Sequence, residues 1–79
     1  MTDQMGTDEA AVSRLIGNNV RTEIFRLGRT QDDVAALLHL GQASLSRRLS
    51  GEVPFRVHEL VVISRALNVP CSKFLEGAC

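Results

Sequence analysis

The chain has 79 residues, of which 44% are hydrophobic but only 4% aromatic, and its formal net charge at pH 7 is zero. This length provides for one domain, near the lower limit at which a chain without disulfides or metal ions builds an adequate core. The aliphatic composition favours an all-α fold over a sheet, no apolar run approaches a membrane span, and the neutral charge argues against a histone-like binder of bulk nucleic acid.

The N-terminal residues 1–7 are expected to form a flexible tail, and residues 8–79 a single folded domain. The first residues are polar and acidic and lack the basic and apolar regions of a signal peptide. We therefore expect a cytoplasmic protein with no membrane association.

A first amphipathic helix is predicted to begin near Thr7 and to end at Gly28. Apolar side chains recur within it at three- or four-residue steps, at Val12, Ile16, Val20, Ile24 and Leu27. Gly17 lies in the middle and weakens a helix by up to about 1 kcal/mol relative to alanine. Either the helix spans this glycine or it begins nearer Ser13, and the sequence leaves both alternatives open.

The second predicted helix begins at Thr30, whose hydroxyl can accept a free backbone N–H. Asp32 and Asp33 fall in its first turn, where the helix dipole favours negative charge, and Thr30 with Asp33 forms the pattern of a capping box. The side of this helix that faces the core is formed by Val34, Leu37 and Leu38. Ala35 is small enough for another helix to cross closely.

A tight turn at residues 39–41 separates this helix from a third one, predicted from Gln42 to about Leu49. His39 is the first residue of this turn. Leu45 and Leu49 are one turn apart and define the buried side, and Gly51 ends the helix. Two short helices around a turn, residues 30–50, form a helix-turn-helix pattern.

Two further helices are predicted after a loop at residues 52–55, in which Pro54 stops the preceding helix and Phe55 packs under it. One runs from about Val57 to Leu67 and ends at a left-handed Asn68. The other is short, opens at Pro70 and ends at Phe74-Leu75. The sequence thus predicts a compact five-helix domain.

The outward side of the helix that starts at Gln42 has the chemistry of a surface that reads DNA. At about 100° per residue, Ala43 and Arg47 point away from the core, Ser44 lies close by, and Ser46 and Arg48 lie on the flanks. Small side chains allow close approach to a groove, and arginine can bind guanine O6 and N7 through two parallel hydrogen bonds. Residues 10–51 hold six arginines against three acids, so positive charge can gather on one face.

Here the sequence resembles the lambda-repressor-like helix-turn-helix family, which includes phage Cro proteins and repressors. The resemblance extends over roughly residues 12–76 and rests on Thr30-Gln31, Ala35, Leu40, Gln42, Leu45, Ser46-Arg47, Gly51, Leu60, Ala66-Leu67 and Val69. This chain departs from the family pattern in three places. His39 replaces the usual turn glycine, and the resemblance implies that it adopts a left-handed backbone conformation. Arg48 replaces an apolar residue, and no serine or threonine cap is present near Arg56.

The resemblance implies that the helix beginning at Gln42 enters the major groove of double-stranded DNA. Predicted base contacts are Gln42, Ala43, Ser44, Ser46 and Arg47, although Gln42 could instead orient its neighbour. Predicted contacts to the DNA backbone are Thr30, Gln31, Arg48 and Arg56. For Arg48 an ion pair with Glu52 or Glu59 at the edge of the core is an equal alternative.

No catalytic, cofactor or metal site is predicted. His39 and His58 have no ligand partners at suitable spacing, and Cys71 and Cys79 do not form a CxxC motif. We expect a buried thiol at Cys71 and a free one at Cys79, with an intersubunit disulfide as the alternative. The sequence also lacks the arrangement of nucleophile, base and acid that an enzyme needs.

These patterns predict a sequence-specific regulator of transcription, specifically a small Cro-like repressor of phage, prophage or bacterial origin. Since one helix reads only a few base pairs, we expect a homodimer on a palindromic operator, joined through the C-terminal Phe74 and Leu75. The length predicts a minimal version of a family whose longer members carry a further domain. The alternative is a protein-interaction module, such as an antitoxin or anti-repressor, that retains the fold.

Overall fold

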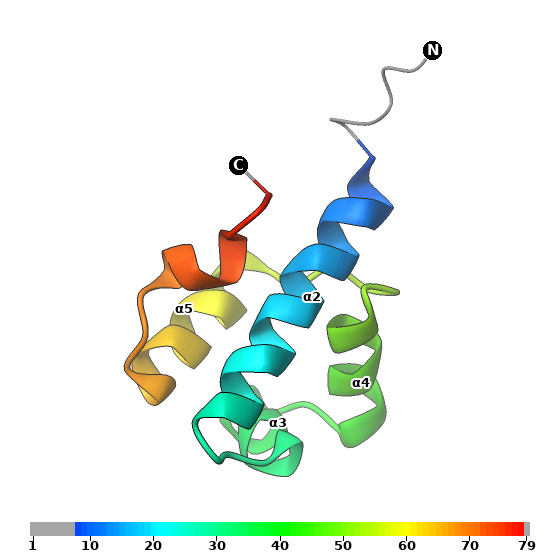
Figure 1. Ribbon diagram of the computed structural model, residues 1–79. Helices are drawn as coiled ribbons and strands as arrows, with labels where there is room; N and C mark the ends of the chain where they lie inside the picture. The colour runs from blue at the N-terminus through cyan, green and yellow to red at the C-terminus, as the bar shows by residue number, and fades with distance from the viewer. Residues whose placement is uncertain (1–7, 79) are drawn as a thin grey trace.

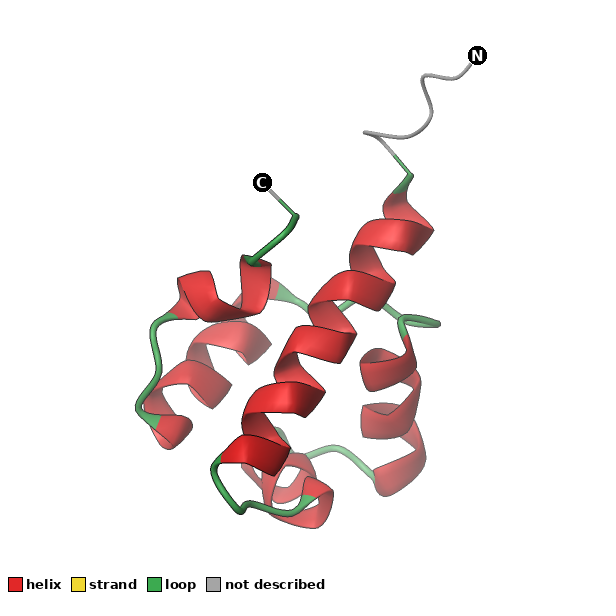
Figure 2. Ribbon diagram, viewed as in Figure 1, coloured by secondary structure: helices red, strands yellow, loops and turns green. Residues whose placement is uncertain are grey.

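The computed structural model describes residues 8–78; the expected tail, residues 1–7, and Cys79 lie outside the described residues. The described part is helical and contains no strand (Figure 2), which confirms the predicted all-α class. The last of the five predicted helices is a 3-10 helix. The elements are α2 (Glu9–Arg26), α3 (Gln31–Leu37), α4 (Gln42–Ser50), α5 (Val57–Leu67) and η1 (Cys71–Leu75).

The long helix α2 runs through the middle of the domain, with α4 on one side and α5 and η1 on the other, while α3 packs near its C-terminal end (Figure 1). One aliphatic core lies between these helices. Its buried members are Val20, Ile24, Val34, Ala35, Leu45, Leu49, Ile63, Leu67 and Phe74. Among residues 8–78, no helix has both the length and the apolar character that a membrane crossing requires.

Helix α2 begins at Glu9 rather than near Ser13, because Asp8 caps it. The Asp8 carboxylate accepts hydrogen bonds from the backbone N–H groups of Ala10 and Ala11, at 3.0 and 3.3 Å. These bonds satisfy two of the donors that a helix start leaves free. The structure therefore selects the alternative in which the helix continues through Gly17.

Gly17 lies where α2 and α4 approach each other closely. A Cβ atom at this position would lie 2.4 Å from the carbonyl oxygen of Leu49 and 2.6 Å from that of Arg48. Only a residue without a side chain allows the backbone of α4 to approach α2 so closely. The sequence alone identified this glycine as a weak point of the helix, whereas the structure makes it a packing contact.

The predicted chain reversals around the motif are confirmed. Thr30 Oγ1 accepts the Asp33 N–H at 3.1 Å, and the Asp33 carboxylate accepts the Thr30 N–H at 3.3 Å, which completes the capping box. His39 adopts the left-handed conformation with φ 56°, as does Asn68 with φ 57°. Gly51, with φ 87°, ends α4.

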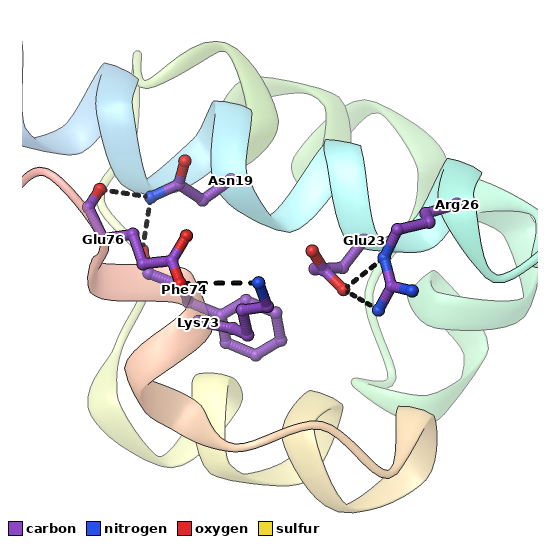
Figure 3. A network of polar contacts seen from close by, with 6 residues as sticks. All are labelled: Asn19, Glu23, Arg26, Lys73, Phe74 and Glu76. Atoms are coloured by element: carbon purple, nitrogen blue, oxygen red, sulfur yellow. Dashed lines mark hydrogen bonds and ion pairs between the residues drawn. The ribbon is translucent and has the colours of Figure 1, made fainter.

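The C-terminal segment contradicts one prediction, because Phe74 has no exposed surface and belongs to the core. The 3-10 helix η1 turns this ring inward between α2 and α5. Asn19 on α2 holds the segment in place (Figure 3): its side-chain nitrogen donates to the carbonyls of Phe74 and Glu76, at 3.0 and 2.9 Å. Phe74 is therefore unavailable for the predicted dimer contact, whereas Leu75 is 36% exposed.

Next to this segment, the buried carboxylate of Glu23 forms an ion pair with Arg26 one turn later on α2 (Figure 3). The distance from Arg26 Nη2 to Glu23 Oε1 is 2.6 Å. The hydrogen bond from Arg26 lowers the pKa of Glu23 below its ordinary value, despite the opposing effect of burial. Glu23 is thus a buried acid that the fold keeps charged.

Candidate nucleic-acid interface

Helix α4 has one buried side and one exposed side, as its sequence predicts. Leu45 and Leu49 are buried in the core. On the other side, Ala43, Ser46 and Arg47 are exposed. The core leucines thus fix the rotation of the helix and keep small side chains and one arginine at the surface.

The remaining predicted site residues are accessible to solvent to different degrees. Gln42, Thr30, Gln31 and Arg56 are exposed, and Ser44 is half-buried. The first turns of α3 and α4 are in contact: the Gln42 side-chain nitrogen donates a hydrogen bond to the carboxylate of Asp32. Asp32 was predicted only as a charge favourable to its own helix. Its contact with Gln42 crosses the turn, and no local pattern in the sequence indicates it.

Arg48 is held inside the protein by an ion pair. Its Nε donates to Glu59 Oε1 at 3.0 Å, and its Nη1 donates to the Ser44 carbonyl at 3.2 Å. The two paired side chains are only 12% and 7% exposed. Of the two alternatives for Arg48, the ion pair at the edge of the core is confirmed, with Glu59 and not Glu52 as the partner.

Glu59 also makes a hydrogen bond at the start of α5, where the N-cap residue Arg56 has no capping side chain. Its Oε1 accepts the backbone N–H of Arg56 at 2.9 Å, so one oxygen atom joins α4 to α5. Burial raises the pKa of Glu59, but the hydrogen bonds from Arg56 and Arg48 outweigh this effect and leave the pKa below the ordinary 4.5. The charged form of the carboxylate is therefore the form that the site stabilises.

The chemistry of this surface suits the binding of an anionic, grooved partner. Arg47 on α4 and Arg56 at the start of α5 are exposed cations, and the small side chains of α4 leave its backbone accessible to close approach. Across residues 8–78, no three His, Cys, Asp or Glu side chains are grouped in a way that could hold a metal ion.

Comparison with known protein families gives one result. A helix-turn-helix family model matches residues 23–74, well over half of the chain. The match covers α3, α4, α5 and most of η1, together with the C-terminal end of α2. A search among curated proteins found no match.

Proposed function

The chain belongs to the lambda-repressor-like helix-turn-helix family of DNA-binding proteins, and from this premise we propose that it is a sequence-specific repressor. In this proposal, a small regulator of phage, prophage or bacterial origin occupies an operator and blocks transcription. The family is a DNA-binding family rather than an enzyme family, in agreement with a surface that offers donors and small side chains.

The observation that carries this proposal is the exposed side of α4. Arg47 projects from the side opposite Leu45 and Leu49, so its guanidinium can reach the edge of a guanine while the leucines stay in the core. We propose α4 as the helix that enters the major groove. Its proposed base contacts are Gln42, Ala43, Ser44, Ser46 and Arg47.

The proposed contacts to the DNA backbone come from the starts of α3 and α5. Thr30 and Gln31 are exposed at the start of α3, and Arg56 is exposed at the start of α5. Backbone N–H groups and side-chain donors at such positions hold phosphates and set the register of the helix in the groove. Arg48 is left out of this set because its guanidinium is paired with Glu59.

We further propose that the protein acts as a homodimer on a palindromic operator. A nine-residue helix reads only a few base pairs, so useful affinity needs two half-sites, with centres about 34 Å apart.

With Phe74 buried, Leu75 is the remaining candidate of the predicted C-terminal contact. Sedimentation equilibrium should show a dimer that Leu75→Ser weakens. Phe25 on α2 is 85% exposed, and dissociation by Phe25→Ser instead would place the interface on α2.

Selection of duplexes from a random pool, followed by mobility-shift titration at several salt concentrations, tests the proposed function. We expect an enriched inverted repeat, whose spacing reports the dimer geometry, and an affinity that falls steeply with salt. Failure to enrich any sequence would contradict the proposal. It would favour the alternative, a protein-interaction module that retains this fold, with which the zero net charge also agrees.

A further inference from the structure

Helix α4 carries two adjacent arginines, one exposed and one held in an ion pair. Arg47 is exposed. Arg48 follows it directly, about 100° further around the helix, and is paired with Glu59 at 3.0 Å in a nearly buried site. A second hydrogen bond, from Nη1 to the Ser44 carbonyl, fixes the guanidinium. Arg48 thus starts beside the proposed reading surface, yet its charge is directed into the protein.

We propose that Glu59 is a positioning residue that withholds Arg48 from the DNA backbone and so limits sequence-independent binding. This inference rests on the proposed function and names a residue that contacts no DNA itself. One of its two carboxylate oxygens, Oε1, accepts hydrogen bonds from both Arg48 Nε and the Arg56 N–H. Glu59 therefore fixes both the side chain it withholds and the element from which Arg56 reaches outward.

The physical reason is the cost of an unpaired buried charge. Without the negative charge of Glu59, the guanidinium of Arg48 would lie in a nearly buried site with no compensating charge, which is strongly unfavourable. The arginine side chain is long enough to move its head into solvent while its stem stays packed. Released there, it lies beside the surface that meets DNA, where each neutralised phosphate steepens the salt dependence of binding.

Glu59→Gln tests this inference, because glutamine keeps the shape and the acceptor oxygen but removes the charge. Binding to a scrambled duplex is measured against salt for the wild type and the variant, with folding checked by circular dichroism. One additional phosphate contact adds about 0.9 to the logarithmic salt slope. Lowering salt from about 200 to about 50 mM should therefore strengthen the binding of the variant about 3.5-fold more than that of the wild type.

Two further variants serve as controls. Arg48→Met with Glu59→Gln removes both partners and should return the salt slope to that of the wild type. Glu23→Gln changes the other buried acid, whose partner Arg26 is already 54% exposed and lies on α2; its slope should match that of the wild type.

An unchanged slope in a folded Glu59→Gln variant would overturn the inference. So would a slope in the double variant that is shallower than that of the wild type, because Arg48 would then already contact a phosphate in the native protein. If Glu59→Gln alone does not fold, the slope of the double variant still tests whether Arg48 contacts a phosphate in the native protein. Failure of the wild type to bind any duplex would instead refute the proposed function.

Discussion

The two sides of α4 obey different constraints. On the inner side, Leu45 and Leu49 are buried, and the backbone carbonyls of Arg48 and Leu49 lie close to Gly17 of α2. On the outer side, Ala43, Ser46 and Arg47 are exposed. The inner side of this nine-residue helix therefore serves stability and the outer side serves recognition. Changes on the inner side should alter folding, and changes on the outer side should alter binding.

The largest effect is expected from Gly17→Ala at the inner side. Elsewhere in a helix this change stabilises by roughly 0.5–1 kcal/mol. Here the added Cβ would meet the Leu49 carbonyl oxygen at 2.4 Å. Because the contact is with backbone, the two helices must separate, and we expect a loss of about 3 kcal/mol in the free energy of unfolding. Urea denaturation measures this loss.

Gly41→Ala is the matched control for this prediction. A Cβ at Gly41 meets nothing within 4 Å, and its φ of −75° suits alanine. The control should change stability by no more than about 1 kcal/mol. If Gly17→Ala proved more stable than the wild type, the close crossing of α2 and α4 would be wrong.

A second effect is the loss of stability in acid. The pKa values of Glu23 and Glu59 are lowered in the folded chain from an ordinary 4.5. Their contribution to stability is therefore complete above the unfolded pKa and is lost as the pH falls through the folded pKa values. Unfolding free energies measured from about pH 7 down to about pH 3 should decline below pH 4.5.

Glu59→Gln should flatten part of this decline, since it removes one of the two groups. The pKa of Glu59 is lowered by a hydrogen bond from the backbone N–H of Arg56, by the hydrogen bond and charge of Arg48, and by the charge of His58. An acid decline equally steep in the variant would show that Glu59 is not held in its charged form.

The smallest effect concerns the turn between the two helices of the motif. His39 adopts φ 56°, a conformation that costs a side-chain-bearing residue roughly 1–2 kcal/mol. His39→Gly should therefore raise the unfolding free energy. The gain should be up to about 1 kcal/mol, because the greater entropy of glycine in the unfolded chain offsets part of the relieved strain. Thermal denaturation should show a smaller gain for Asn68→Gly, because asparagine tolerates φ 57° better. Equal gains would contradict this explanation.

The sequence predicts well those features that depend on neighbouring residues. The capping box of Thr30 and Asp33, the left-handed His39 and the end of α4 at Gly51 follow from short-range chemistry. The buried side of α4 follows from helical spacing. This local chemistry is enough to predict the helix-turn-helix and the exposure of Arg47.

Features that depend on distant partners were predicted incompletely or not at all. Gly17 could not be identified as a contact because the carbonyl it meets belongs to Leu49. The inward turn of Phe74 depends on Asn19, which lies far from it in the sequence. For Arg48, spacing leaves two acids as partners, and only the three-dimensional fold, which brings Glu59 of α5 to Arg48, selects Glu59.

The measurement that tests the central claim most directly is Arg47→Ala, followed by two readouts on the same sample. Loss of a bidentate contact to guanine costs about 1–3 kcal/mol, so affinity for the selected operator should fall by roughly five- to 150-fold. Its unfolding free energy should stay within about 0.5 kcal/mol of the wild type, because the side chain is exposed. Unchanged operator affinity in a folded Arg47→Ala variant would contradict the assignment of α4 as the reading helix.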